Sequence, residues 1–343
     1  MTTLVLLVSL LSLQTLDGEQ PLERIAFGSC AHQDKPQPIW KAIIQTKPQL
    51  FLFTGDNIYG DSANVDVMRA KYAQLAAKPG YQKMLQTAPI LSVWDDHDYG
   101  LNDGGAEFKG RQETEKLFLD FFKIPADSER RSRPGIYGSS FFGPPGRRLQ
   151  IILLDTRYFR SRGVKSNIPR DQRPAGQGPY LGNKNPEATV LGPDQWTWLE
   201  QQLKLPAQIR LIVSSTQVVA YEHWWESWGL FPLQRQAMFD LIQKTGAEGV
   251  FFISGDVHRA ELSCRKGEPY PLYDLTSSGL TESWDGTDAL SNRFRVKDHL
   301  YSRNNFGQIR IDWQQAVPKI HLSIHDETGA QVFGHHISLD ELK

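Results

Sequence analysis

The segment Phe53-Thr54-Gly55-Asp56-Asn57-Ile58-Tyr59-Gly60-Asp61 continues an apolar run that begins at Leu50. A continuous apolar run of this length is typical of a strand that is buried on both faces of a sheet. The Gly-Asp pair behind it is an ordinary turn signal. In this chain the turn also carries a carboxylate and a phenol, which can both bind a metal. The segment therefore predicts a buried strand that ends at a ligand site.

Three more segments have the same construction, in which an apolar run ends in residues that can bind a metal. They are Phe27-Gly28-Ser29-Cys30, Val93-Trp94-Asp95-Asp96-His97-Asp98 and Ile253-Ser254-Gly255-Asp256-Val257-His258. In open α/β folds, ligands bind in the crevice outside the carboxyl ends of the strands. Side chains from four separate strands are therefore expected to meet at one metal site.

The types of ligand in these segments restrict the choice of metal. Hard oxygen, imidazole, phenolate and thiolate donors all occur, and they belong to Asp56, Asp96, Asp256, His258, Tyr59 and Cys30. Such a mixture argues against a pure magnesium site and favours a transition metal beside a harder cation. Two metals together can stabilise both the attacking and the leaving oxygen of a displacement at phosphorus.

Composition and charge set outer limits on the function. The chain has 343 residues, of which 40% are hydrophobic and 22% are charged. These values are ordinary for a globular protein, and the length permits one large domain. The formal net charge is −1, so no strong field would draw the protein to nucleic acid, and no nucleic acid-binding surface is evident.

The pattern of residues predicts one α/β domain with a β-rich C-terminal end. Strands and helices alternate through the first two thirds, and no low-complexity linker divides the chain. The expected strands are 24–29, 50–54, 90–94, 149–154, 211–214 and 249–253, and the expected helices are 38–45, 65–77, 109–122, 193–203 and 234–244. The polar stretch 160–185 is expected to be a long surface loop, whereas 306–313, 318–325 and 331–337 are expected to be strands.

The first residues indicate a signal peptide. Leu4 to Leu13 is an apolar run that is too short to span a membrane but has the length of a signal-peptide core. No basic residue precedes it, and a buried first strand is the alternative. We expect a signal peptide over residues 1–19, a mature domain over 20–343, no integral membrane segment after signal removal, and a secreted, periplasmic or otherwise extracytoplasmic protein.

Two groups of residues allow a structural and a functional interpretation. Cys30 and Cys264 could form a disulfide, but Cys30 has a better use as a ligand. The cluster Trp224-Trp225-Glu226-Ser227-Trp228 could belong to the core or could form the wall of a substrate cleft.

The four segments together resemble the motifs of PhoD-type alkaline phosphatases and phosphodiesterases, which belong to the calcineurin-like metallophosphoesterases. Supporting segments are Leu154-Asp155-Thr156-Arg157-Tyr158, Leu191-Gly192-Pro193-Asp194-Gln195-Trp196 and Thr276-Ser277-Ser278-Gly279. The resemblance covers about residues 24 to 313. Unlike many members of the wider superfamily, this chain has Cys30 in place of an Asp-x-His motif, and Asp256 in place of a histidine.

The resemblance implies a four-layer α/β/β/α sandwich with the site at its edge. It further implies a ferric ion, Fe³⁺, with one or more divalent partners, typically Ca²⁺. By analogy, Cys30, Tyr59 and His258 would bind iron, Asp56 would bridge, and Asp96 and Asp256 would bind the divalent ion. His97 would stabilise the phosphate or protonate the leaving group, a role that suits imidazole.

Further residues are weaker candidates. Asn57 could bind substrate, but it is also typical of a turn. Arg157 and Arg259 could each donate a bidentate pair of hydrogen bonds to a phosphate, or could each form a structural salt bridge. One of Asp95 and Asp98 is expected to orient His97 or a ligand, and His32 could lie behind the Cys30 turn.

The sequence therefore predicts a metal-dependent phosphomonoesterase or phosphodiesterase, in which a metal-bound hydroxide attacks the phosphorus of a phosphate ester directly. One alternative is a phospholipase D-like phosphodiesterase on the same scaffold, with the tryptophan cluster against lipid. A second alternative is a non-catalytic extracytoplasmic binding module.

Overall fold

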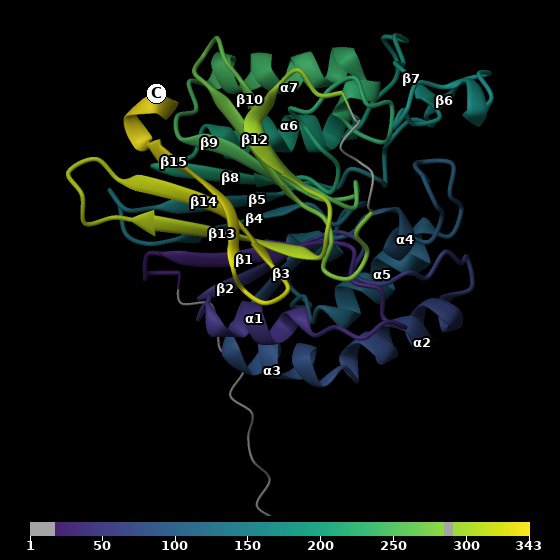
Figure 1. Ribbon diagram of the computed structural model, residues 1–343, viewed down its shortest axis with the longest axis horizontal. Coiled ribbons are helices and arrows are strands. Elements are labelled where there is room, and N and C mark those ends of the chain that lie inside the picture. The colour runs from purple at the N-terminus through teal and green to yellow at the C-terminus, as the bar shows by residue number, and fades with distance from the viewer. Residues whose placement is uncertain (1–17, 285–290) are drawn as a thin grey trace, which may run out of the picture.

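The computed structural model describes residues 18–284 and 291–343, so the predicted signal peptide lies almost wholly outside the described residues. Two β-sheets pack together in the middle of the molecule, and helices cover the outer face of each sheet (Figure 1). This arrangement confirms the predicted α/β/β/α sandwich.

One of the two central sheets has six strands, in the order β15-β14-β13-β1-β2-β3. Its strands are β1 (Arg24–Gly28), β2 (Leu50–Thr54), β3 (Ile90–Val93), β13 (Asn305–Asp312), β14 (Lys319–Asp326) and β15 (Gln331–Ser338). Strand β1 runs parallel to β2 on one side and antiparallel to β13 on the other. The sheet therefore joins the early strands to the last ones.

The other central sheet has seven strands, in the order β12-β10-β11-β9-β8-β5-β4. Its strands are β4 (Gly138–Phe142), β5 (Leu149–Leu153), β8 (Ile209–Val213), β9 (Val250–Ser254), β10 (Ala260–Arg265), β11 (Leu272–Ser277) and β12 (Arg295–Tyr301). Strands β5, β8 and β9 are parallel neighbours in which every residue is buried. This burial explains why they read as mainly apolar runs, in which the polar residues are Gln150, Arg210 and Ser254.

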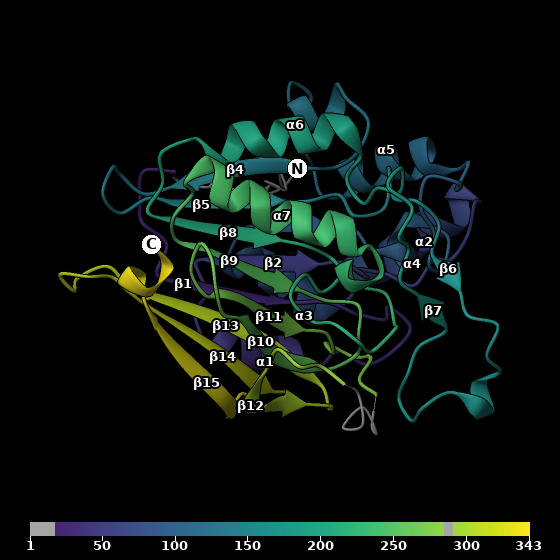
Figure 2. The ribbon, with the colours of Figure 1, turned by 90° about the horizontal axis from the view of Figure 1, so that it is seen from above.

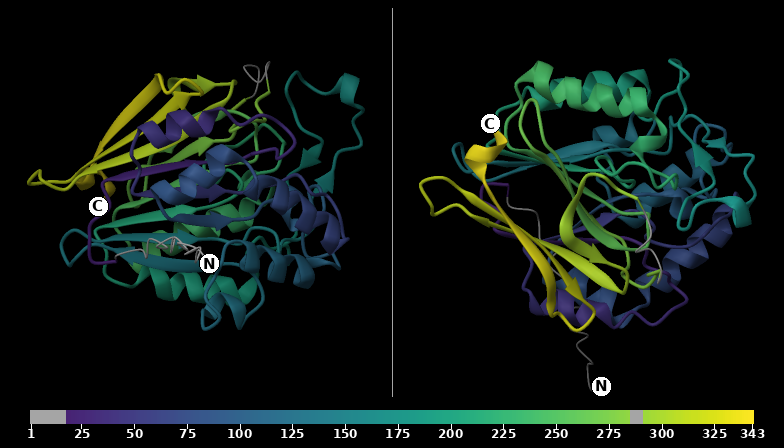
Figure 3. Two further views of the ribbon diagram at one scale, coloured as in Figure 1. Left: turned by 90° about the horizontal axis from the view of Figure 1, so that it is seen from below. Right: turned by 45° about the horizontal axis from the view of Figure 1, so that its top comes forward.

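Helices form the two outer layers. Figure 2 shows α6 and α7 over the seven-stranded sheet, and Figure 3 shows the early helices over the six-stranded sheet. The helices are α1 (Ile39–Gln45), α2 (Val65–Ala76), α3 (Pro79–Thr87), α4 (Asp96–Tyr99), α5 (Arg111–Phe121), α6 (Gly192–Leu203) and α7 (Pro232–Thr245). None of the helices in the described ranges could cross a membrane, because none combines the necessary length and apolar character.

The structure corrects one prediction and adds elements that the pattern did not indicate. The stretch 160–185 is not simply a loop, because β6 (Val164–Lys165) pairs with β7 (Tyr180–Leu181) and makes it a short ribbon. Tyr180 is buried and fixes this ribbon to the body of the protein through a hydrogen bond to Asp103. Helices α3 and α4 and strands β4, β10, β11 and β12 were not expected.

Candidate metal centre

The candidate ligands lie just beyond the carboxyl ends of strands in both sheets. Cys30, Asp56 and Asp96 follow β1, β2 and β3 of the six-stranded sheet, while Asp256 and His258 follow β9 of the seven-stranded sheet. The two sheets meet here, since Ser29 forms an isolated parallel bridge with Ser278. The site thus depends on the packing of one sheet against the other.

The backbone at this junction is unusual. Cys30, Asp56, Asp256 and His258 have φ values of 61°, 51°, 71° and 55°. Non-glycine residues rarely adopt positive φ, and such residues cluster at functional sites. The turns after β1, β2 and β9 therefore hold their side chains in conformations that the rest of the structure must stabilise.

The first group of candidate ligands contains Cys30, Asp56 and His258, whose donor atoms lie within 4.8 Å of one another. The thiol Sγ of Cys30 is 3.3 Å from Oδ2 of Asp56. The hydroxyl of Tyr59 lies 3.5 Å from Nε2 of His258, and the ring of His32 stacks on Tyr59 at 4.6 Å. The structure thus brings together all four residues that the sequence assigned to iron or to its bridge.

The second and third groups extend the site. Asp56, Asp96 and His97 have donor atoms within 4.8 Å, and so do Asp95, Asp96 and Asp256. Asp56 belongs to the first and second groups, which is the position that a bridging carboxylate would take. His97 belongs to the second group as well, so its imidazole lies beside the carboxylates of Asp56 and Asp96.

The negative charge of these groups is only partly balanced by cationic side chains of the protein. Asp56 Oδ1, Asp95 Oδ2 and Asp96 Oδ1 are buried side-chain oxygens without a hydrogen-bond partner. Burial raises the pKa of Asp56 well above its usual range, and the nearby thiol of Cys30 raises it further. Burial also raises the pKa of Asp256 strongly, and the charge of Asp95 adds to it. Buried carboxylate oxygens without a hydrogen-bond partner are costly, so this donor set fits metal ions that would bind these oxygens.

The pKa of His97 responds to the same carboxylates. Burial disfavours the charged imidazole, but the charges of Asp96 and Asp56 outweigh it and raise the pKa of His97 to about 11. Its Nδ1 lies 2.7 Å from Oδ1 of Asp61, and its ring packs against Tyr59 at 4.2 Å. Asp61 therefore fixes the orientation of the ring, a role that the sequence did not reveal.

Arg157 lies beneath the carboxylates and does not line the pocket. Its side chain is fully buried, with Nε 2.5 Å from Oδ1 of Asp95 and Nη1 2.8 Å from Oε2 of Glu226. Its Nη2 lies 3.6 Å from Oδ1 of Asp96 and 4.0 Å from Oδ1 of Asp256. The structure therefore places Arg157 as a salt-bridge partner of the acidic side chains, outside the lining of the pocket.

Asn57 is also placed away from the pocket. It is fully buried, and its amide donates to the carbonyl of Val93 at 2.9 Å and to Asp98. Asp98 in turn accepts from the backbone N–H of Asp95 at 2.6 Å, so both side chains stabilise the turn after β3. The interpretation of Asn57 as a turn residue agrees with this geometry better than substrate binding.

Arg259 does line the pocket but is held by Glu261, to which its Nη2 donates at 2.9 Å. Gln217, in the segment that follows β8, donates to Glu261 and Thr276 at 2.8 Å each. Cys264 lies in β10, and neither cysteine is in a disulfide.

Sequence reasoning missed two polar residues of the site, Asp103 and Glu226, which lie beside the predicted ligand Asp96. Asp96, Asp103 and Glu226 form a fourth group of carboxylates. Both oxygens of Glu226 are paired, one with Arg157 and one with Arg160, while Asp103 accepts from Tyr180. This group therefore forms a salt-bridge network beside the ligands. No local signal marks it, because Glu226 is far from the other two residues in the sequence.

The ligands open into a pocket of about 280 Å³. Two indoles form part of its rim, since Trp225 and Trp284 meet edge to face at 5.3 Å and both line the pocket. Trp228 is fully buried instead and donates to Oγ of Ser214 at 3.1 Å. One tryptophan of the cluster therefore belongs to the core, and another lines the pocket. The lining residues are Asp56, Asp96, His97, Asn102, Asp103, Trp225, Glu226, Asp256, Val257, His258, Arg259 and Trp284.

Comparisons with known proteins agree with this architecture. A family model described as PhoD-like phosphatase matches residues 25–316. A comparison with curated protein sequences gave no significant match. One similar solved structure is described as the structure of PhoD, with a TM-score of 0.69 and 17% identity, over 93% of this chain and 72% of that chain.

Two further solved structures share the fold. A dimetal phosphatase from Danio rerio has a TM-score of 0.58 and 14% identity, over 93% of this chain and 100% of that chain. GAP50, described as the anchor in the inner membrane complex of Plasmodium, also has a TM-score of 0.58, with 12% identity over 93% of this chain and 89% of that chain.

Proposed function

Because the chain belongs to the PhoD-like phosphatase family, we propose that it hydrolyses phosphate monoesters or diesters by direct in-line attack of water at phosphorus. The observation that carries the proposal is the position of Asp56. Its carboxylate lies between a thiolate–imidazole group and a carboxylate–imidazole group, and one of its oxygens is buried and unpaired. A residue in this position can hold two cations close together.

The residues divide by chemistry into two sets. Cys30, Tyr59 and His258 would hold a ferric ion, while Asp96 and Asp256 would hold a divalent ion such as Ca²⁺, with Asp56 between them. Such ions, when bound, polarise the phosphoryl oxygens and lower the pKa of bound water. Buried Arg157 keeps Asp95 oriented and lies near Asp96 and Asp256, so it limits the repulsion among the carboxylates.

His97 is the residue best placed to act on the substrate itself. It lines the pocket next to Asp56 and Asp96, and Asp61 orients its ring through Nδ1. Its Nε2 is therefore available to donate a proton or a hydrogen bond to the leaving oxygen of the ester. A group in this role contributes roughly 10²- to 10⁴-fold to the rate.

The rim of the pocket supports an organic group on the substrate. Trp284 is 44% exposed, which is high for a large apolar residue. Its backbone N–H donates to the carbonyl of His258 at 2.9 Å. This hydrogen bond holds the residue next to a candidate metal ligand. An exposed indole also suits the phospholipase D-like alternative, and phosphatidylcholine therefore belongs among the test substrates.

The decisive experiment measures metal content and activity together. The purified protein should contain iron and a divalent ion, and should hydrolyse 4-nitrophenyl phosphate or bis(4-nitrophenyl) phosphate. Asp56→Ala should abolish activity and reduce both metals, because it removes the shared ligand. Asp127→Ala is the control, since Asp127 is exposed and does not line the pocket.

The same experiment separates catalysis from the alternative of a binding module. GAP50 is described as an anchor, so the shared fold does not decide between the two roles. A protein that binds metals but turns over neither ester nor phosphatidylcholine would contradict the proposal. Asp256→Ala should lose activity but retain more iron than Asp56→Ala, and the reverse order would exchange the two metal positions.

Export of the protein is a separate part of the proposal. It rests on the apolar run from Leu4 to Leu13, which has the length of a signal-peptide core. The N-terminal sequence of the protein recovered from the expressing cells would test it. A start near residue 20 would support removal of a signal peptide, whereas retention of Met1 in a cytoplasmic fraction would contradict it.

A further inference from the structure

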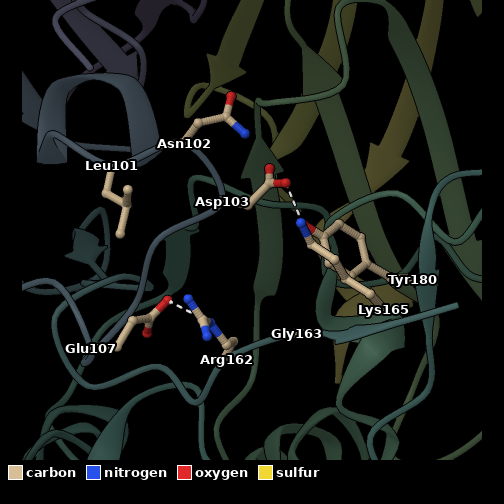
Figure 4. Close-up of a pocket in the computed structure, with 8 residues that line it drawn as sticks. All are labelled: Leu101, Asn102, Asp103, Glu107, Arg162, Gly163, Lys165 and Tyr180. Carbon is tan, nitrogen blue, oxygen red and sulfur yellow. Dashed lines mark hydrogen bonds and ion pairs between the residues drawn. The ribbon is translucent and has the colours of Figure 1, made fainter. Parts of the chain in front are cut away.

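A second pocket, of about 450 Å³, lies next to the candidate metal site. It shares Asn102 and Asp103 with the first pocket, so these two residues form a common wall. The side opposite the segment 101–107 is formed by the β6–β7 ribbon. Figure 4 shows the lining residues, which are Leu101, Asn102, Asp103, Glu107, Arg162, Gly163, Lys165 and Tyr180.

The ribbon makes this side of the molecule basic. Between residues 161 and 185 there are five cationic side chains and one carboxylate, although the whole chain has a net charge of −1. Two of these cations, Arg162 and Lys165, line the second pocket and are exposed. The local charge therefore favours an anion at a place adjacent to the metal site.

The two carboxylates of the second pocket have partners within the protein. Asp103 accepts a hydrogen bond from the hydroxyl of Tyr180. Oε1 of Glu107 lies 3.6 Å from Nε of Arg162. An exposed ion pair of this kind contributes little to the stability of the protein. Lys165 forms no ion pair with any residue in the described ranges 18–284 and 291–343. In Figure 4 the side chain of Arg162 turns toward Glu107.

We propose that the second pocket is an anion subsite, which binds a further phosphate group of a substrate whose scissile phosphate lies at the metal site. The proposal rests on the phosphoesterase function. It assigns Lys165 and Arg162 to the non-reacting phosphate, and it defines the preferred substrates as esters that carry two phosphate groups.

The subsite can be tested by binding, without turnover. Calorimetry on the metal-loaded protein would compare thymidine 5′-monophosphate with thymidine 3′,5′-bisphosphate, and fructose 6-phosphate with fructose 1,6-bisphosphate. Because hydrogen bonds to charged groups are strong, at least one bisphosphate should bind about tenfold more tightly than its monophosphate. The advantage should shrink at high salt, since the cations are exposed.

Three variants test the assignment of residues. The double variant Arg162→Gln/Lys165→Gln should lose the advantage of the bisphosphate and bind the monophosphate within about twofold of the parent. The control Arg170→Gln/Lys184→Gln removes the same charge from exposed positions of 161–185 outside the pocket, and should keep the advantage. Glu107→Gln should increase it, because Arg162 loses its competing carboxylate.

The outcomes separate the subsite from the proposed function. Equal affinity for monophosphates and bisphosphates in the parent would overturn the subsite, even if the protein hydrolyses esters. If Arg162→Gln/Lys165→Gln still preferred the bisphosphate, the subsite would also be overturned. If the control variant lost the preference equally, the subsite would again be overturned, and the preference would arise from the overall positive charge of residues 161–185. Preferential binding of a bisphosphate by a protein that hydrolyses no ester would support the subsite and contradict the phosphoesterase function.

Discussion

At the scale of single residues, Tyr59 offers the most direct test of the metal. Burial raises the pKa of its hydroxyl well above the usual range, so a phenolate forms here only if a cation binds it. A ferric–phenolate pair absorbs visible light, and we expect the iron-loaded protein to be violet to blue. Tyr59→Phe should lose the band, while Tyr301→Phe, on β12, should keep it. Absorption spectra with iron analysis would check this, and an active, colourless protein without iron would contradict it.

His97 permits a kinetic prediction at the same scale. His97→Ala should slow the hydrolysis of an alkyl phosphate by about 10²- to 10⁴-fold, because the leaving alkoxide needs a proton. The loss should be much smaller for 4-nitrophenyl phosphate, whose leaving group is already stable. Asp61→Asn should show a weaker form of the same pattern, since it only orients the ring.

A control and a counter-result sharpen the test of His97. His336→Ala changes an exposed histidine of β15 and should behave as the parent. An equal loss on alkyl and nitrophenyl substrates would show that His97 positions the phosphate and does not protonate the leaving group.

Single residues also show what the sequence could reveal of the site. Cys30, Asp56, Asp256 and His258 could be identified because each follows an apolar run. Glu226 could not, because its partner Arg157 lies 69 positions away and nothing local links them. Arg157 was visible but ambiguous, since a buried salt bridge and a phosphate contact need the same guanidinium group.

At the scale of secondary structure elements, the turn after β2 depends on Gly55. Its φ is +104°, and a Cβ there would lie 2.6 Å from Cβ of Asp95. Gly55→Ala should therefore destabilise the protein by more than the roughly 1–3 kcal/mol of backbone strain alone. Gly146→Ala is the matched control, because its φ is +86° but a Cβ would meet nothing within 4 Å. Urea unfolding of both variants checks the difference, and equal losses would show that packing against Asp95 is unimportant.

Elements also differ in how well the sequence predicts them. Strand β2 was predicted with its observed bounds, because all five of its residues are apolar or buried. Helix α3 was missed since it starts with Pro79-Gly80, which reads as a turn. Gly80 is there for packing, as a Cβ would lie 2.7 Å from Cβ of Trp40 in α1. Strands β10 and β11 carry polar residues that only tertiary contacts bury, so their pattern is weak.

At the scale of the whole molecule, Arg157 connects segments that follow β3, β5 and β9. Arg157→Leu should lower the free energy of unfolding by about 3–5 kcal/mol, because it leaves buried carboxylates without their cation. Arg170→Gln, on the exposed ribbon, should change it little. Chemical denaturation of both variants would check this, and a small effect of Arg157→Leu would mean that the bound metals already balance the carboxylates.

The stability of the whole molecule should also depend on pH in a way that reveals the metals. In the metal-free protein, burial raises the pKa of Asp56 and Asp256 above the value of about 3.9 in an unfolded chain. Above that value the folded state binds more protons than the unfolded state, so the free energy of unfolding falls as pH rises.

Metal ions should remove this loss, because they stabilise the ionised carboxylates and bind more tightly as their ligands lose protons. The difference in Tm between metal-loaded and metal-free protein should therefore be larger at about pH 8 than at about pH 5. Thermal unfolding at both pH values, with each form, is the measurement. A difference that stays constant or shrinks with rising pH would contradict the role of these two carboxylates.

The position of β1 sets the order in which a newly made chain can become complete. This strand lies in the interior of its sheet, between β2 and β13, and β13 begins only at Asn305. At a synthesis rate of about 5–20 residues per second, β1 waits roughly a quarter of a minute to a minute for that neighbour. Until then, the edge of β1 that β13 will cover has open hydrogen-bonding groups. Folding of this protein is therefore an event that follows translation, and a chaperone or export factor has that interval in which to bind the chain.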